Sequence, residues 1–262
     1  MSLITILILI FSGVVTGFVN SLSAGGTAIS IALYLSLGLS PTVANATNRI
    51  GVLFQTGTTA VLMHRKKQIP MRAVFFYSIP TIIGAVIGAK TSAIIDEQFF
   101  AYALGIVLLM MIFFISLPTK RLQTDNEQKI NKGITVWKVL IFLSTGFYGG
   151  FVQVGSGFLL ILAGTAGLGY GLMKSNGLKV AIMFFYTIAS LITFSLNVEI
   201  NWQYGLLHSF GNMIGAWIAT FLAIKKGVGF VRWIIIIVIL FTAALLFGLI
   251  DLNNFFIALG AK

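Results

Sequence analysis

The sequence predicts an all-α membrane protein, a polytopic bundle of two inverted-topology repeats with discontinuous helices at its centre. Long apolar segments, matching motifs in the two halves and a swap of basic charge between equivalent loops predict this class. Of the 262 residues, 58% are hydrophobic and only 9% are charged, whereas a soluble domain carries about 25% charged residues. This composition excludes a soluble enzyme, a disordered chain and a nucleic-acid binder. The net charge of +11 lies in short basic clusters between apolar segments, as in membrane proteins.

The apolar segments have the length that a bilayer requires. A membrane-spanning helix needs roughly 20 mostly apolar residues, and eight segments qualify or nearly qualify: 3–22, 42–62, 73–93, 99–117, 136–153, 178–197, 203–224 and 231–250. Two shorter apolar runs, 27–39 and 157–172, follow Gly- and Ser-rich breaks at 20–27 and 153–157. Whether these runs span fully or are re-entrant is left open. The first segment is expected to stay in the mature protein, because no Lys or Arg precedes Arg49 as a signal peptide would require.

The chain divides into two related halves of about four to five helices each. A first membrane repeat covers 1–117, a polar linker 118–135 and a second repeat 136–262. An offset of about 130 residues aligns 13–19 (GVVTGFV) with 146–152 (GFYGGFV), 37–38 with 168–169, Asn45 with Asn176, and 83–85 with 214–216; Arg49 then falls on Lys179 within one gap. The common order of these matches favours a duplication.

The loops predict opposite orientations for the two halves. Loop 63–72 holds four Lys or Arg residues and no acid, while the equivalent loop 198–202 holds only Glu199. Conversely, loop 90–98 carries Lys90, Asp96 and Glu97, while its equivalent 225–232 carries Lys225, Lys226 and Arg232. Because Lys and Arg favour the cytoplasmic side, this swap indicates an inverted repeat. The linker is then cytoplasmic, and both termini are extracytoplasmic in a bacterial inner membrane.

The two breaks predict a central anion site. Backbone that leaves a helix within the membrane must be buried in protein or line a wet cavity, and paired breaks in inverted halves are typical of transporter substrate sites. Each short helix would begin there with free N–H groups and the positive end of its dipole. Glycines at 25, 26, 155 and 157 let an oxyanion approach this backbone, and hydroxyls of Ser23, Thr27 and Ser156 can donate to it.

Two cations inside the spans strengthen this prediction. Ser40 and Pro41 are typical of an N-cap and a first helical residue, which places Arg49 about two turns into its helix. Lys179 is expected about one turn into a helix that starts at 175–177. A central Arg costs about 2.5–3.5 kcal/mol on insertion scales and needs a partner or a wet cavity. No Asp or Glu lies inside a predicted span, so carbonyls, water or a substrate anion remain as partners.

Several of these patterns also have structural interpretations. The Gly-x-x-x-Gly pairs at 13–17, 84–88 and 146–150 are typical of helix-packing surfaces. The breaks could be tight hairpins, Arg49 could serve a structural carbonyl contact, and Lys179 could extend to the cytoplasmic interface. His208 is expected to be an interfacial or packed residue rather than a proton relay. The 118–135 charges are expected in a solvated loop, and the aromatic residues mostly face lipid or pack.

The residues resemble the TauE/SafE sulfite exporter family, also called the 4-toluene sulfonate uptake permeases. The resemblance is carried by 13–39 (GVVTGFVNSLSAGGTAISIALYLSLGL) with 44–49 (ANATNR), and by 146–169 (GFYGGFVQVGSGFLLILAGTAGLG) with 176–179 (NGLK). It covers nearly the whole chain and implies a polytopic inner-membrane carrier of sulfite, sulfonates or sulfoacetate. It also implies that the Gly-rich turns at 23–27 and 155–157, the 47–49 element and Lys179 form the site.

Together these observations predict a transporter that moves a small organosulfur or sulfur oxyanion by alternating access. Export is favoured, because an inside-negative voltage drives anions out and no carboxylate in the spans can carry a proton for uptake. An anion channel and an uptake permease for another small oxyanion or carboxylate are the alternatives, and a structural subunit stays open. The chain has no Cys and two His, so we expect no enzyme site, metal or cofactor. The expected partners are a small anion and lipid, not nucleic acid, and a homodimer stays open. The predicted substrate-binding residues are Asn20, Ser21, Ser23, Gly25, Gly26, Thr27, Asn45, Asn48, Arg49, Gln153, Gly155, Ser156, Gly157, Asn176 and Lys179.

Overall fold

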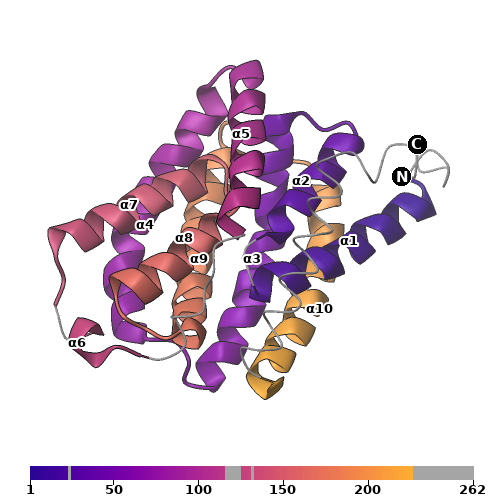
Figure 1. The fold of residues 1–262 in the computed structure, drawn as a ribbon. Coiled ribbons are helices and arrows are strands. Elements are labelled where there is room, and N and C mark those ends of the chain that lie inside the picture. The colour runs from indigo at the N-terminus through magenta and orange to yellow at the C-terminus, as the bar shows by residue number, and fades with distance from the viewer. Residues whose placement is uncertain (23–24, 116–124, 131–132, 227–262) are drawn as a thin grey trace.

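The computed structural model describes residues 1–22, 25–115, 125–130 and 133–226, and within these ranges it contains helices and no strand. Figure 1 shows them as one bundle with the long helices α3 and α9 in its middle. The elements are α1 (Leu3–Leu22), α2 (Gly26–Ser36), α3 (Pro41–Arg65), α4 (Met71–Ile94), α5 (Glu97–Ile115), α6 (Glu127–Ile130), α7 (Val136–Phe151), α8 (Ser156–Leu162), a π-helix η1 (Ala163–Gly167), α9 (Leu172–Ser195) and α10 (Trp202–Lys226).

The predicted spans correspond closely to these helices, and the all-α membrane class is confirmed. The 3–22 segment is α1, and five other predicted segments up to 224 match α3, α4, α5, α7 and α10 within a few residues. Segment 178–197 matches α9, which begins six residues earlier, at Leu172. Segment 231–250 lies outside the described residues. By length and hydropathy, α1, α4, α9 and α10 could each cross a membrane. The 25-residue α3 is more polar because it buries a row of polar side chains inside the bundle.

Helices of the two halves pack against each other in a reciprocal way. The first helix of one half pairs with the fourth helix of the other, since α1 packs against α10 and α4 against α7. The third helices, α3 and α9, pack against each other and against α10 and α4 respectively. This pairing agrees with two related halves, while the inverted repeat itself stays a prediction.

The Gly-x-x-x-Gly pairs lie at these two interfaces. A Cβ atom at Gly13 or Gly17 would lie 2.2 Å from a carbonyl oxygen of α10, and one at Gly146 or Gly150 would lie 2.1 Å from a carbonyl oxygen of α4. Real Cβ atoms essentially never come closer than 3.0 Å, so only glycine permits these backbones to touch. The packing interpretation of these motifs is confirmed.

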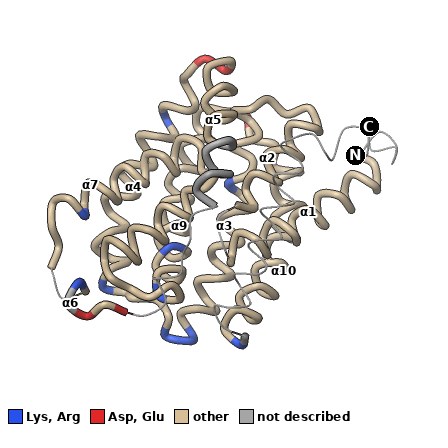
Figure 2. Tube along the Cα trace, in the orientation of Figure 1, with Lys and Arg blue, Asp and Glu red and all other residues tan. Residues whose placement is uncertain are grey.

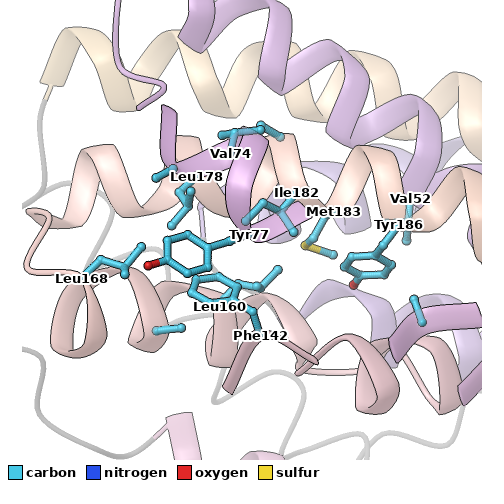
Figure 3. Packing of buried hydrophobic residues seen from close by; sticks show 14 residues of the cluster. Val52, Val74, Tyr77, Phe142, Leu160, Leu168, Leu178, Ile182, Met183 and Tyr186 are labelled. Atoms are coloured by element: carbon cyan, nitrogen blue, oxygen red, sulfur yellow. The ribbon is translucent and has the colours of Figure 1, made fainter. Parts of the chain in front are cut away.

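An aromatic and aliphatic cluster joins α3, α4, α7, α8 and α9. In Figure 3 the rings of Tyr77 and Phe142 lie against each other beside Leu160 and Ile182, with 4.4 Å between the ring centroids. The same cluster ends at Tyr186, which belongs to the second break. Apolar packing therefore holds α8 against α4 and α9 and fixes where the second break lies.

Charged residues gather at the two ends of the bundle (Figure 2). The basic turn between α3 and α4, the α6 segment and the end of α10 lie at one end, and acidic residues of the α4–α5 turn lie at the other. The described part of the linker makes contacts that a solvated loop would lack, because Asp125 pairs with Lys174 and accepts the Gly171 N–H at 2.7 Å. The Asn126 N–H donates to the Gly169 carbonyl at 2.7 Å. The linker thus docks onto the start of α9.

Candidate functional site

The two predicted breaks are real interruptions between helices. The first separates the end of α1 at Leu22 from Gly26 of α2, and Ser23 lies outside the described residues. The second is a tight turn between α7 and α8 in which Gln153 and Gly155 have φ of 65° and 75°. A left-handed backbone is easy for glycine but strained for glutamine. Such strain persists only where the surroundings impose it, and it is concentrated at functional sites.

A buried polar cluster surrounds the first break. Asn20 closes the turn, since its Oδ1 accepts the Thr27 N–H at 3.2 Å and its Nδ2 donates to the Thr27 hydroxyl at 3.1 Å. The Ser21 hydroxyl lies 3.0 Å from that of Thr59 on α3 and 3.5 Å from Gln55 Nε2. Polar side chains of α3 therefore complete this end of the site.

An equivalent cluster surrounds the second break. Gln153 Nε2 donates to the Thr187 hydroxyl of α9 at 3.3 Å. The Ser156 hydroxyl donates to the Gln153 carbonyl and lies 2.8 Å from the Tyr186 hydroxyl. Helix α3 therefore supplies side chains to the first cluster and α9 to the second, and these two helices pack against each other.

Arg49 reaches the second break from α3 and is fully buried. Its guanidinium donates to the Gly149 carbonyl at 3.2 Å, to the Gly150 carbonyl, and to the Ser190 hydroxyl at 2.9 Å. The ring of Phe194 lies 4.5 Å from its Cζ atom. These partners carry no negative charge, and within the described ranges Nε has no hydrogen-bond partner. Arg49 therefore binds carbonyls at the C-terminal, negative end of α7, and no acid of the described residues compensates its charge.

Lys179 has the same relation to the first break. It is 1% exposed, and its Nζ donates to the Asn20 carbonyl near the end of α1 at 2.9 Å. The expected alternative, extension to the cytoplasmic interface, is therefore wrong. The predicted helix start is also wrong, because α9 begins at Leu172 and Lys179 lies about two turns inside it. Gly177 thus lies inside α9 and does not mark its start. The glycine is needed there because a Cβ would lie 2.3 Å from the Gln68 carbonyl.

The two cations make similar contacts across the halves. Arg49 binds the Gly150 carbonyl near the end of α7, and Lys179 binds the Asn20 carbonyl near the end of α1. Asn45 Nδ2 donates to the Phe151 carbonyl at 2.9 Å, and Asn176 Nδ2 donates to the Ser21 carbonyl at 3.0 Å. The third helix of each half thus holds the end of the first helix of the other half.

The structure brings most of the predicted site residues to these two clusters. The helix-start N–H groups are partly occupied, because Asn20 takes that of Thr27 and Gln153 takes that of Ser156. Asn48 is buried, and neither of its amide atoms has a partner. The roles of these residues in binding an anion stay predictions. Sequence reasoning missed the polar partners Gln55, Thr59, Tyr186, Thr187, Ser190 and Thr220. Polar residues inside apolar spans are the signal that could have found them.

Comparison with known proteins agrees with this architecture. The sequence model described as "Sulfite exporter TauE/SafE" matches residues 9–246. The chain belongs to this family. It is 26% identical over 230 residues to a "Probable membrane transporter protein" of Haemophilus influenzae, covering 88% of this chain and 89% of that protein. It is 24% identical over 232 residues to "Probable membrane transporter protein YfcA" of Escherichia coli K12, covering 88% and 85%. No solved structure matches. The protein is thus a multi-pass membrane transporter of the TauE/SafE family.

Proposed function

We propose that this transporter moves a small organosulfur or sulfur oxyanion, such as sulfite, a sulfonate or sulfoacetate, out of the cell by alternating access. The family, which is described as sulfite exporters, supports the substrate class. In this proposal the two halves are inverted repeats in the inner membrane, with the linker and the basic turn at 63–72 cytoplasmic and both termini extracytoplasmic. The protein then acts as a carrier without enzymatic chemistry.

The uncompensated charge of Arg49 is the observation that carries the proposal. A buried cation whose bonded partners are carbonyls and a hydroxyl leaves a net positive potential at the second break. A desolvated site with such a potential favours an anion. The free Nε donor suits an oxyanion, since Arg binds oxyanions through several N–H groups. Asn48, with an unpartnered amide one residue away, can add a further donor.

Flux through purified protein in liposomes tests this function. We expect uptake or release of sulfite, methanesulfonate or sulfoacetate by the wild-type chain, and loss of that flux in Arg49→Gln. The matched control is Arg65→Gln, because Arg65 is an exposed arginine at the end of the same helix. A folded Arg49→Gln variant with unchanged flux would remove Arg49 from the site.

A thermal-shift panel separates substrate binding from transport. A ligand that binds the folded state raises the melting temperature in proportion to the logarithm of its concentration over its affinity. We expect sulfur oxyanions to raise it and chloride not to. Single-channel currents in planar bilayers would instead support an anion channel.

A further inference from the structure

A third buried polar cluster lies between α2, α3 and α10, and it shares Asn48 with the proposed anion site at the second break. His208 and Asn212 of α10 lie against Gly51 of α3, where a Cβ atom would come within 2.8 Å of Asn212 Nδ2 and 3.1 Å of His208 Nδ1. The ring of Tyr34 on α2 lies 5.4 Å from the imidazole, centroid to centroid. Asn48 stands one turn before Gly51, on the same side of α3. All four polar side chains are at most 1% exposed.

This cluster contains several unpartnered polar atoms. Among the residues that the structure describes, His208 Nε2, the Tyr34 hydroxyl, Asn212 Oδ1 and both amide atoms of Asn48 have no hydrogen-bond partner. Leaving a buried donor or acceptor unpaired costs about 1–3 kcal/mol each. A set of this size within one region indicates that the site binds something that satisfies it in another state of the transporter.

The orientation of the Asn212 amide favours one tautomer of the neutral imidazole. Asn212 Nδ2 lies 2.6 Å from His208 Nδ1 and 3.1 Å from the His208 carbonyl, so the amide donates to both. Nδ1 then accepts, and the neutral ring carries its proton on Nε2. A second proton would bind the lone pair of Nδ1 and displace the Asn212 donor. Rotation of the Asn212 amide would let its Oδ1 accept from the new Nδ1–H. The hydrogen bond from Asn212 Nδ2 to the His208 carbonyl would then be lost.

Few other ionisable groups face this imidazole. Helix α1 has none and α2 has only Tyr34, whose hydroxyl oxygen can accept from Nε2–H. The remaining ones on the packed helices are Arg49, which binds α7, and Tyr204, His64, Arg65, Lys225 and Lys226. Imidazole is the side chain whose charge ordinarily changes between about pH 5 and 8. Among the described spans, His208 is therefore the buried group suited to take up and release a proton.

We propose that His208 is a proton-binding site, and that its imidazole carries a proton which moves together with the anion. This inference rests on the proposed function, since it names the coupling ion of that same transport. The position supports coupling, because Asn48 precedes Arg49 on α3 and the helix joins the imidazole cluster to the second break. A single negative charge that moves with a proton crosses the membrane as a neutral pair, so the voltage neither drives nor opposes it. Export then depends on the outward concentration gradient of the anion.

The first experiment measures proton movement with anion movement. Liposomes that contain the protein and a pH-sensitive dye in the lumen receive methanesulfonate on the outside, which gives an inward gradient. Methanesulfonate is the anion of a strong acid and carries no proton itself. We expect the lumen to acidify with the wild-type chain, and His208→Gln to lose this acidification. His64→Gln is the matched control, because it removes the exposed imidazole at the end of α3 and should acidify like the wild type. Acidification in His208→Gln equal to the wild type overturns the proposal.

The second experiment observes the proton site without altering it. The chain has two histidines, so His64→Gln leaves His208 as the single imidazole for nitrogen-15 NMR in bilayers. We expect its nitrogens to change from the neutral to the doubly protonated signature as the pH is lowered with methanesulfonate present, because a buried imidazole without an acid beside it needs the anion to compensate its positive charge. An imidazole that stays neutral throughout overturns the proposal, whether or not His208→Gln folds. Absence of any anion flux with a titrating His208 would instead contradict the proposed substrate.

Discussion

Replacement of Gly88 by alanine tests how closely α4 and α7 are packed. A Cβ at this position would lie 2.0 Å from the Phe147 carbonyl oxygen, and at least 3.0 Å is needed. The two helices must therefore separate by about 1 Å, and a gap of that size loses a quarter to a half of the dispersion energy of the contacts involved. Overpacking typically costs about 1–3 kcal/mol, and association of helices in lipid depends on such packing.

The matched control is Gly105→Ala on α5, where a Cβ would meet nothing within 4 Å. Alanine is favoured over glycine in a helix by about 1 kcal/mol, so both variants gain this term and only Gly88→Ala loses packing. The difference of ~2 kcal/mol corresponds to roughly 4–8 °C in melting temperature, which tryptophan fluorescence in detergent can follow. If Gly88→Ala melts at or above Gly105→Ala, the close-contact argument is wrong.

Three further predictions concern the charged groups. Lys179→Met should abolish anion flux, because the Asn20 carbonyl loses its buried donor, while Lys174→Met, at an exposed lysine near the start of α9, should retain it; retained flux in Lys179→Met excludes a role in transport. The chain has no cysteine, so single cysteines can be introduced in place of Lys66 and of Asp96. The cysteine at position 66 should be protected from an impermeant external reagent, and the one at position 96 should react. Labelling of both from one side would contradict the inverted topology. Burial raises the pKa of Asp125, but hydrogen bonds from Lys174 and the Gly171 N–H lower it below its ordinary value. The stabilisation that the Asp125 carboxylate gives to the docked segment is therefore present above about pH 3.9. It is lost as the pH falls through the lower pKa of the folded state. Hydrogen-exchange protection of 125–130 should therefore fall on acidification, and Asp125→Asn should show no such acid dependence.

Much of the fold follows from patterns that the bilayer imposes. The length of apolar runs predicted α1 and α4 almost to the residue, and the Gly-x-x-x-Gly spacing predicted packing surfaces. The start of α9 was misplaced because Gly177 looks like a helix boundary, whereas it is required by the loop that crosses it at Gln68. A close approach by a segment distant in the chain leaves no local signal.

The candidate site was predicted in part. The position of Arg49 about two turns into α3 follows from Ser40 and Pro41, and its burial follows from the absence of a route to water. Its binding to carbonyls of α7 could not be predicted, since it depends on the tertiary arrangement of helices about 100 residues apart in the chain. The same holds for His208, whose neighbour Tyr34 lies on a different helix.

The glycine contacts also determine which parts of the molecule can move as units. Because backbone touches backbone between α1 and α10, and again between α4 and α7, each rigid block combines helices from both halves. A transport cycle that preserves these two helix interfaces must shift the α1–α10 pair relative to the α4–α7 pair, with α3 and α9 sliding or tilting between them. A covalent crosslink within one pair should leave turnover intact, whereas a crosslink between the two pairs should arrest it.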